Sequence, residues 1–317
     1  MADARPDVVV LGGGVAGLTA ARALTAAGRS VVLVEAKGRL GGRILTVRAP
    51  GCPWPLELGA EFAHGDPAVT RRLTREAGLT SYDARFEMAS LGGGERLSHD
   101  GDMAGDVARL VDEVRARRPG DISVAAFLDE LTAHDAGWQA RREAVLLYVC
   151  GFHAADPGRM SVHALATEED ARGQGQGADQ RIVEGYDRIV DHLAAGVDPA
   201  SVWLRTVARR LDWEPGRARV AVTTDGRWER VIEARAAVVA LPLGVLQAAE
   251  GEEGALQFSP PPGHARDAIA RLASGPALHA VLHFTRPFWE DEARGGERPW
   301  RDLSFFRVPS APIAVWW

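Results

Sequence analysis

The hydrophobic and polar positions near the N-terminus follow strand and helix patterns in turn. Residues 8–11 are a β-branched run, which is typical of a strand buried on both faces. Residues 16–27 are alanine-rich and predict a helix that ends at Gly28, and residues 30–34 predict a second buried strand. A strand, a helix and a strand within about 30 residues indicate one parallel βαβ unit.

Apolar residues three and four apart dominate the middle of the chain, from 67 to 195, and predict that it is mainly helical. The helices expected there span 104–117, 123–131 with Ser123 as N-cap, 138–150 and 186–195. Strand patterns follow at 202–207, 219–224, 228–233 and 237–241, then a helix at 264–272 and a strand at 277–284. Residues 173–177 read Gly-Gln-Gly-Gln-Gly and are a candidate crossover between domains.

Composition narrows the class of protein. The 317 residues are 46% hydrophobic and 25% charged, which excludes disorder, collagen and fibrous repeats and suggests about two domains. The net charge of −6 with scattered arginines offers no basic face for nucleic acid. Lys37 is the only lysine among 37 Lys and Arg residues, which indicates a GC-rich, bacterial genome.

Cysteine usage and hydropathy favour a cytoplasmic protein. Cys52 and Cys150 cannot build a disulfide framework, and we expect both to be free, buried thiols in a reducing cytoplasm. The N-terminus leads directly into a strand pattern, without room for a signal peptide. The most apolar run, 236–246, is interrupted by Pro242 and Gly244 and is too short for a membrane helix.

A glycine-rich motif follows the first predicted strand. Residues 12–17 read Gly-Gly-Gly-Val-Ala-Gly, and Glu35 stands at the end of the next strand, as a dinucleotide-binding fingerprint requires. Gly12 would allow the tight turn, Gly14 the approach of a pyrophosphate, and Gly17 the close packing of helix and strand. The helix N-terminus attracts the phosphates, and Glu35 would accept hydrogen bonds from a ribose. The alternative is a glycine-rich turn without a ligand.

A second turn carries two guanidinium groups. Residues 35–43 read Glu-Ala-Lys-Gly-Arg-Leu-Gly-Gly-Arg, so Arg39 and Arg43 flank a Gly-Gly turn that suits a second approach to phosphates. An ordinary charged turn is the alternative. Together with the first motif, this pattern resembles the flavin-containing amine oxidase family, which includes monoamine and polyamine oxidases and uses FAD.

Further segments support the resemblance in order and spacing. They are 58–65 (Leu-Gly-Ala-Glu-Phe-Ala-His-Gly), 183–186 (Val-Glu-Gly-Tyr), 240–246 (Ala-Leu-Pro-Leu-Gly-Val-Leu) and 275–289, and with the first strand they span residues 8 to 289. The motifs and the resemblance give these candidate FAD-binding residues: Gly12, Gly14, Val15, Ala16, Gly17, Glu35, Ala36, Arg39, Gly41, Gly42, Arg43, Gly59, Ala60, Glu61, Phe62, Val207 and Pro242.

The resemblance implies oxidation of an amine, with hydride transfer from the carbon beside a neutral amine nitrogen to the flavin. Oxygen would reoxidise the flavin, giving H2O2 and an imine that hydrolyses. In polyamine-oxidase-like members the histidine that matches His64 faces the substrate, so His64 is a candidate catalytic residue. The alternative is a histidine hydrogen-bonded to a loop carbonyl without a chemical role.

One catalytic position departs from the family pattern. The family places a lysine, which bonds through a water to the flavin, where this chain has His279. Histidine is shorter and titrates near neutrality, so slower turnover or drift toward inactivity are both open. His283 falls on the same strand face, but no carboxylate or cysteine accompanies the pair, so no metal site is predicted.

The resemblance also implies the domain organisation. We expect an α/β fold in which a Rossmann-like, glutathione-reductase-type FAD domain (1–82 and 178–255) is interleaved with an α+β substrate domain (83–177 and 256–317). Family members continue for another hundred or more residues, whereas 314–317 (Ala-Val-Trp-Trp) reads as an interrupted strand, so we expect a truncated product. A related flavoprotein acting on an amino acid, carotenoid or porphyrinogen precursor, and a non-catalytic fragment, remain alternatives.

Overall fold

The chain forms two compact units, which are described separately. The computed structural model describes residues 5–65, 67–84, 88–91, 97–98, 103–174, 179–286, 304–308 and 315–317. Unit 1 comprises residues 1–61, 68–81 and 182–274, and unit 2 comprises 62–67, 82–181 and 275–317. The unit boundaries at 81/82 and 181/182 fall near the predicted domain boundaries, but unit 1 continues to 274 rather than 255. The domain assignment itself stays a prediction.

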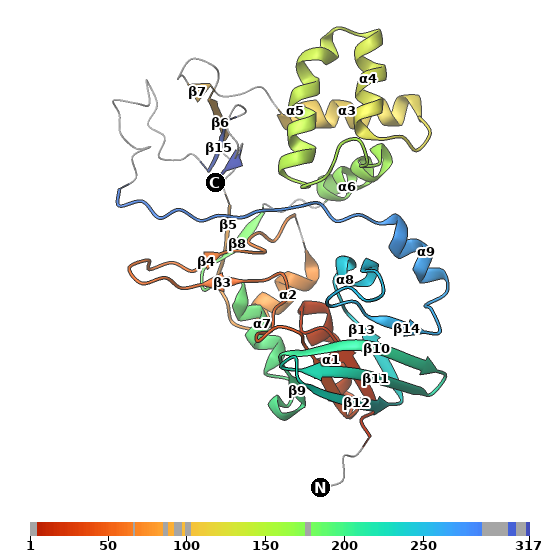
Figure 1. The fold of residues 1–317 in the computed structure, drawn as a ribbon. Helices are drawn as coiled ribbons and strands as arrows, with labels where there is room; N and C mark the ends of the chain where they lie inside the picture. Colours follow the sequence, from red (N-terminus) through yellow and green to blue (C-terminus); the bar gives the residue numbers. More distant parts are fainter. Residues whose placement is uncertain are drawn as a thin grey trace. The chain divides into compact units, whose positions relative to one another are not determined.

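A parallel sheet forms the centre of unit 1 (Figure 1). Its strands lie in the order β13 (Ala236–Val239), β1 (Val8–Leu11), β2 (Val31–Val34) and β9 (Val202–Trp203). Helix α1 (Val15–Ala26) connects β1 to β2, as the βαβ pattern predicted. Because all the pairings are parallel, the carboxyl ends of the strands meet at one edge of the sheet.

Both faces of β1 are covered, which explains its uninterrupted apolar sequence. On one face Val10 packs with Leu18 of α1 and Leu193 of α7 (Asp187–Ala194). On the other face Leu11 packs with Val220 of an antiparallel sheet. Unit 1 therefore has three layers: helices, the parallel sheet and a second sheet.

The second sheet has the order β12 (Trp228–Ala234), β11 (Arg217–Thr224), β10 (Thr206–Glu214) and β14 (Gln257–Ser259). The predicted single strand 202–207 is wrong, because it divides between β9 and β10. Arg205 takes a positive φ of 50° there, so the chain turns from one sheet into the other. Two short helices follow, α8 (Leu243–Gln247) and α9 (His264–Arg271).

Shorter elements complete unit 1: β3 (Thr46–Val47), β4 (Leu56–Glu57), α2 (Ala68–Glu76) and the 3-10 helix η1 (Pro199–Ser201). The β3–β4 hairpin is tied to the start of α7 by Arg48, whose guanidinium donates to both carboxylate oxygens of Asp187 at 2.8 and 3.1 Å. That hydrogen bond raises the pKa of Arg48. Glu57 adds a second tie, because its carboxylate accepts the backbone N–H of Tyr186 at 2.7 Å.

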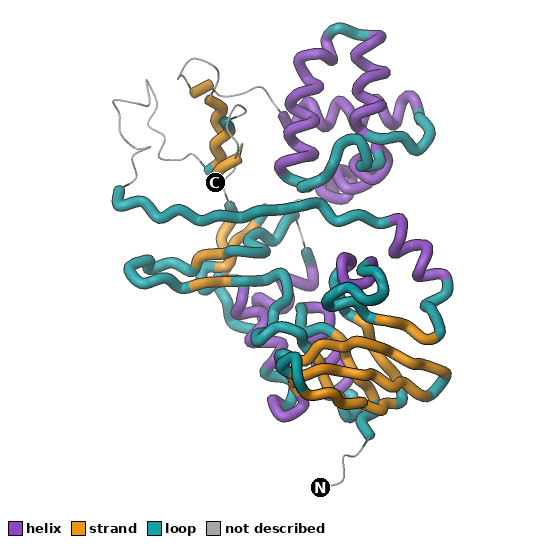
Figure 2. The backbone as a smooth tube through the Cα atoms, in the orientation of Figure 1, coloured by secondary structure: helices purple, strands orange, loops and turns teal. Residues whose placement is uncertain are grey.

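Helices build the main core of unit 2 (Figure 2). They are α3 (Met103–Arg117), α4 (Val124–His134), α5 (Gly137–Gly151) and α6 (Val162–Gln174). Leu110, Phe127 and Leu165 are fully buried between them. Ser123 is confirmed as the N-cap of α4, since its hydroxyl accepts the N–H of Ala126 at 3.2 Å.

Strands also occur in unit 2, where the sequence predicted mainly helix. β16 (Val315–Trp316), β15 (Phe305–Arg307), β6 (Met88–Leu91) and β7 (Leu97–Ser98) form one sheet, and β16 agrees with the strand read at 314–317. β5 (Ser81–Asp83) pairs with β8 (Gln180–Ile182), and one end residue of each, Ser81 and Ile182, belongs to unit 1. The other short strands carry too little alternation to be read from sequence. The predicted crossover, 173–177, lies partly in α6, which reaches Gln174, and partly at 175–177, outside the described residues.

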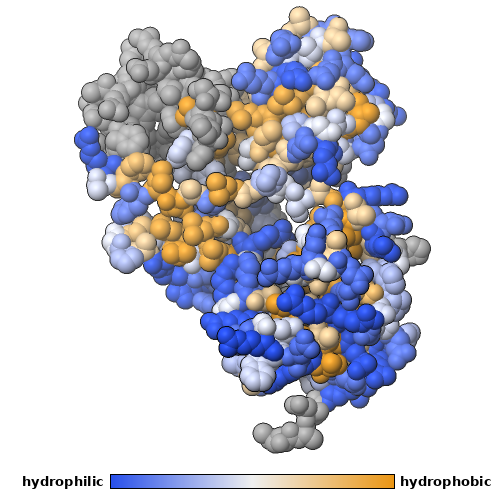
Figure 3. Space-filling view, viewed as in Figure 1, coloured by the Kyte–Doolittle hydropathy of each residue, from blue (hydrophilic) through white to orange (hydrophobic). Residues whose placement is uncertain are grey.

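Two further predictions are wrong. Residues 277–284 are extended but form no strand, because none of the described strands pairs with them, and Leu278 is 89% exposed. Figure 3 shows apolar surface along this segment. The cysteines are free, as expected, but Cys52 is half-buried and Cys150 is exposed on α5. Among the helices described, none is both long and apolar enough to cross a membrane.

The helical core generates a stability prediction. Replacing Leu110 by alanine should cost about 2–5 kcal/mol of unfolding free energy, because it removes a fully buried side chain from between packed helices. Urea unfolding followed by circular dichroism measures the loss. Leu278→Ala is the matched control, since its exposed side chain should change stability by about 0.5 kcal/mol or less. Equal losses in the two variants would contradict the described core.

Candidate functional site

The loop between β1 and α1 is pressed against the carboxyl end of β13. Gly12 has a φ of +108°, and a Cβ on it would lie 2.5 Å from the carbonyl oxygen of Ala240. Its backbone N–H donates to the carbonyl of Val34 at 2.8 Å. A side chain cannot occupy this position, so glycine is required both for conformation and for space.

Gly17 and Gly14 differ in what surrounds them. A Cβ on Gly17 would lie 1.9 Å from the Gly12 carbonyl oxygen, so the missing side chain lets α1 approach the strand. A Cβ on Gly14 would meet only the Gly42 Cα at 3.9 Å. The space at Gly14 suits the approach of a phosphate, whereas the space at Gly17 is filled by protein.

The N-terminus of α1 suits an anion. Gly14 is the N-cap and supplies no side-chain cap, and the first turn contains no acidic residue. The N–H groups of Val15, Ala16 and Gly17 have no partner within the helix, because the first intrahelical bond runs from Leu18 to the Gly14 carbonyl. Val15 is half-buried and Ala16 is exposed. Orphan donors and the positive end of the helix dipole together attract phosphate.

Among the described residues Glu35 is the only buried charged one, and it follows β2 directly. One carboxylate oxygen accepts the N–H of Gly13 at 2.6 Å, and the other accepts the N–H of Lys37 at 2.8 Å. Each oxygen keeps a further acceptor site, which two ribose hydroxyls could use. Ala36 beside it is exposed, and Val207 is half-buried near the start of β10.

The Gly-Gly turn lies against the first loop. The N–H of Gly41 donates to the Gly13 carbonyl at 2.8 Å, and Gly41 and Gly42 both have positive φ. The Arg39 guanidinium donates to the carbonyls of three neighbours at 2.9 to 3.1 Å: Leu40, Gly42 and Ile44. Arg39 therefore fixes the shape of the turn. Arg43 is exposed, and its backbone carbonyl accepts the N–H of Ala60 at 3.1 Å.

Two further segments reach the same edge of unit 1. A Cβ on Gly59 would lie 2.1 Å from the Arg43 carbonyl oxygen, so residues 59 and 60 lie beside the Gly-Gly turn, and Glu61 follows them. Pro242 is the N-cap of α8, two residues after Ala240, whose N–H donates to the Leu11 carbonyl at 2.8 Å. The structure thus brings four separate segments together at the carboxyl ends of β1, β2 and β13.

Phe62, His64 and His279, in contrast, belong to unit 2. Nδ1 of His64 lies 2.7 Å from a carboxylate oxygen of Asp179, so its partner is a carboxylate and not a loop carbonyl. The other Asp179 oxygen accepts the N–H of Gly65 at 2.7 Å.

A row of aromatic rings connects the two histidines. The ring centroids are separated by 5.7 Å from His64 to Phe62 and by 6.3 Å from Phe62 to Phe305. The next separations are 6.3 Å from Phe305 to Trp317 and 5.1 Å from Trp317 to His279. The two candidate catalytic residues, which are 215 positions apart in sequence, therefore lie at the ends of one aromatic row. Aromatic faces suit both methylene chains and ammonium groups.

Sequence reasoning missed two participants. Gly13 was treated as the variable position of the motif, yet its N–H bonds Glu35 and its carbonyl bonds Gly41. The position of Gly13 inside the glycine motif at 12–17 is the sequence signal that could have identified it. Asp179 carries no motif and follows the glycine-rich stretch, so only the fold shows its pairing with His64.

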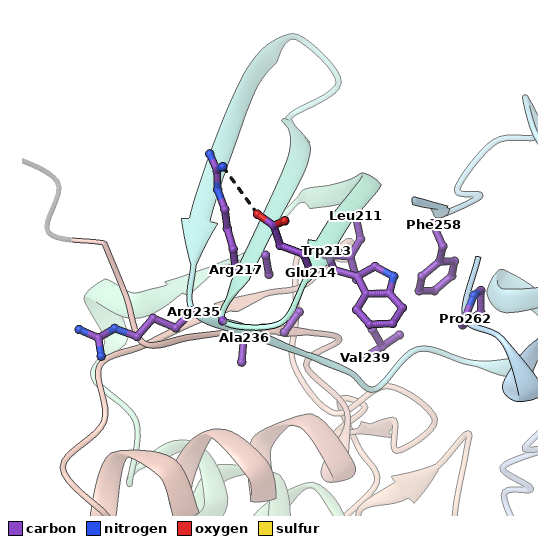
Figure 4. Close-up of a pocket in the computed structure, with 12 residues that line it drawn as sticks. Leu211, Trp213, Glu214, Arg217, Arg235, Ala236, Val239, Phe258 and Pro262 are labelled. Carbon is purple, nitrogen blue, oxygen red and sulfur yellow. Dashed lines mark ion pairs between the residues drawn. The ribbon is translucent and has the colours of Figure 1, made fainter. Parts of the chain in front are cut away.

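A cavity of about 340 Å³ in unit 1 lies elsewhere (Figure 4). Leu211, Trp213 and Phe258 give it an apolar wall, and Glu214 and Arg217 form an ion pair of 3.9 Å beside it. Its lining runs along β13 from Ala236 to Val239 and includes none of the candidate FAD-binding residues. In the part of the chain that the structure describes, no group of three or more His, Cys, Asp and Glu residues could hold a metal ion.

Comparisons with known proteins bear on this site. The sequence model of the family described as flavin containing amine oxidoreductase matches residues 15–311. Polyamine oxidase 3 of Oryza sativa is 30% identical over 310 residues, covering 90% of this chain and 60% of the rice protein. Putrescine oxidase of Kocuria rosea is 28% identical, covering 92% of this chain and 66% of the relative. The chain thus spans about 60% of the length of the polyamine oxidases it matches.

Solved structures support the fold. Putrescine oxidase bound to putrescine superposes with a TM-score of 0.72 at 21% identity, covering 98% of this chain and 72% of the other. Cyclohexylamine oxidase from Brevibacterium oxydans gives a TM-score of 0.65 at 19% identity, covering 84% of this chain and 63% of the other. At these identities the likeness establishes a shared Rossmann-like α/β fold, as the βαβ pattern and the resemblance predicted.

The different surroundings of Gly17 and Gly14 predict different effects of substitution by alanine. Gly17→Ala should cost about 1–3 kcal/mol of unfolding free energy, or more, because its Cβ would clash with the Gly12 carbonyl. Gly14→Ala, the matched control, should cost about 0.5–1 kcal/mol, because alanine is a poorer N-cap than glycine, while its Cβ enters open space and its φ of −76° suits alanine. Urea unfolding of flavin-free protein measures both. A loss in Gly14→Ala as large as that in Gly17→Ala would refute the described packing.

Proposed function

The chain belongs to the flavin-containing amine oxidoreductase family, and we propose that it binds FAD through unit 1 and oxidises a small amine. The observation that carries the proposal is the convergence of the glycine loop, Glu35, the Gly-Gly turn and the 59–60 segment at one sheet edge. In open α/β sheets, ligands bind outside the carboxyl ends of the strands. The fit is good, because orphan N–H donors, room at Gly14 and a buried carboxylate occur together.

Each group has a separate part in holding FAD. The N–H groups of Val15 and Ala16 would bind the pyrophosphate, and Gly14 would leave space for it. Glu35 would bind the ribose of the adenosine half while its bonds to backbone N–H groups keep it in place. Arg43 would add a guanidinium for the phosphates, and Arg39 would maintain the turn that presents it. Gly59, Ala60, Glu61, Val207 and Pro242 complete the proposed set in unit 1, and Phe62, which belongs to unit 2, stays a candidate from the sequence alone.

The bound cofactor would supply the redox chemistry, accepting a hydride from the carbon beside a neutral amine nitrogen and passing electrons to oxygen, with imine and H2O2 as products. The chain's own residues would orient the amine and handle its proton. His64 and His279 are the candidates, and the aromatic row between them would contact the hydrocarbon part of the amine. Small amines are proposed because matched relatives are named polyamine and putrescine oxidases.

We also propose a bacterial, cytoplasmic setting, supported by the arginine-rich composition and the two free cysteines. The proposed partners are the amine and oxygen, rather than nucleic acid or a membrane. The net charge of −6 supports the exclusion of nucleic acid, and cationic amines would be attracted to such a protein.

The proposal predicts both a flavin spectrum and reduction by amines. Purified chain should show the visible absorption of bound flavin, and anaerobic addition of putrescine, spermidine or a monoamine should bleach it. Absence of bound flavin after reconstitution with FAD would contradict the cofactor proposal. Bound flavin that no amine bleaches, but an amino acid does, would contradict the proposed substrate class.

His279 provides a second test. His279→Lys should increase the rate at which oxygen reoxidises the reduced protein, because the longer side chain restores the group that the family uses there. Stopped-flow absorbance after anaerobic reduction measures this rate. His283→Lys, an exposed neighbour on the same segment, is the matched control and should leave the rate unchanged. The same rate in wild type and His279→Lys would remove His279 from the mechanism.

A further inference from the structure

We propose that Asp179 is a positioning residue, which holds the His64 imidazole with its proton on Nδ1 and so presents an unprotonated Nε2 to the substrate amine. This inference rests on the proposed amine oxidation and adds to it a residue that the motifs do not include. It concerns only unit 2, in which both residues lie.

The Asp179 carboxylate makes two short contacts with the His64 segment. One oxygen lies 2.7 Å from Nδ1 of His64, and the other accepts the N–H of Gly65 at 2.7 Å. The carboxylate side chain is 18% exposed and the imidazole is 49% exposed. The carboxylate is therefore mostly covered, while part of the ring remains accessible to a small molecule.

Backbone hydrogen bonds hold both residues in register. Ala63 and Gln180, the neighbours of His64 and Asp179 in the chain, exchange N–H to carbonyl bonds of 2.8 and 3.0 Å. The Asp179 carbonyl accepts the N–H of Ala84 at 2.7 Å. The pair is thus fixed by its backbone, unlike exposed ion pairs that must order two long side chains for little net gain.

The chemistry of the contact selects one tautomer. An ionised carboxylate has no proton to donate, so Nδ1 must donate, and the lone pair of the neutral ring is left on Nε2. Among the described residues, no hydrogen bond is found at Nε2, so the structure assigns it no protein partner. Nε2 is therefore the atom that can accept a proton from a ligand.

An amine needs this acceptor before it can lose hydride, because the nitrogen lone pair must be available. When an ammonium group meets Nε2, its N–H bond breaks, the electron pair stays on the amine nitrogen, and an Nε2–H bond forms. The resulting imidazolium is balanced by the Asp179 carboxylate at 2.7 Å. Before the transfer, the pair carries one negative charge that attracts the cationic amine.

A purely structural role for Asp179 makes a different prediction. If the carboxylate only joined residues 64–65 to residue 179, Asp179→Asn would have little effect, since the Asn carbonyl can still accept the Gly65 N–H. The Asn amide, however, donates to Nδ1 and forces the proton onto Nε2. Asp179→Asn therefore changes the position of the His64 proton while it keeps the hydrogen bond to the Gly65 N–H, so it distinguishes an effect of the tautomer from an effect on the fold.

The test combines NMR with kinetics on the full chain reconstituted with FAD. Histidine ¹⁵N spectra, with the His64 signal assigned by its loss in His64→Asn, should show the Nδ1–H tautomer in wild type and the Nε2–H tautomer in Asp179→Asn. The rate of flavin reduction at saturating putrescine should fall about tenfold to a hundredfold, within the range of general acid–base effects. Asp83→Asn is the matched control, because among the described hydrogen bonds the Asp83 carboxylate accepts the Gln180 side-chain amide at 2.9 Å and none joins it to His64. Its rate should stay within about twofold.

The NMR and kinetic results together decide whether Asp179 positions His64. Tautomer reversal with a slower reduction supports the inference, provided that Asp83→Asn behaves as wild type. A wild-type His64 with its proton on Nε2, or a reversed tautomer without a rate change, overturns it. If no amine reduces wild-type flavin, the proposed function fails and the catalytic part of this inference fails with it. The NMR result then still shows separately whether Asp179 sets the tautomer.

Discussion

The contact between Gly17 and the Gly12 carbonyl is the constraint on which unit 1 depends. Because a Cβ would lie only 1.9 Å from that oxygen, only glycine lets the first turn of α1 approach the end of β1. This approach brings the helix N-terminus to the sheet edge, where Glu35 bonds the same loop through Gly13. The proposed contacts to phosphate and to ribose would then both depend on this one packing requirement.

Unit 2 has a different proposed task, which is to orient an amine rather than to hold a dinucleotide. Its helices supply a stable apolar core, while the aromatic row joins His64 to His279 through rings that tolerate methylene chains. Asp179 gives one end of this row a defined proton arrangement. The functional division between the units follows from their chemistry: backbone donors and a carboxylate in one, aromatic rings and imidazoles in the other.

Local sequence patterns predicted the elements that depend on neighbouring residues. They did not predict the contacts that depend on residues far away in the sequence. The βαβ unit followed from apolar runs and glycine spacing, and Ser123 capped its helix as expected. Residues 277–284 carry a strand pattern, but a strand also needs a hydrogen-bonding neighbour. Arg39 stays a candidate phosphate-binding residue, and the structure adds that its guanidinium donates to three carbonyls of its own turn. Asp179 pairs with His64 across 115 positions, which no local pattern encodes.

The central claim is that the loops at this sheet edge hold a dinucleotide. Its most direct measurement is an equilibrium titration of flavin-free wild type and Gly14→Ala with FAD and with FMN, which lacks the adenosine half. The account predicts that wild type binds FAD at least tenfold more tightly than FMN, a difference of about 1.4 kcal/mol or more. It also predicts that Gly14→Ala weakens FAD binding by about tenfold or more, because its Cβ fills the space at the helix N-terminus. Equal affinity for FAD and FMN, or unchanged FAD affinity in Gly14→Ala, would contradict it.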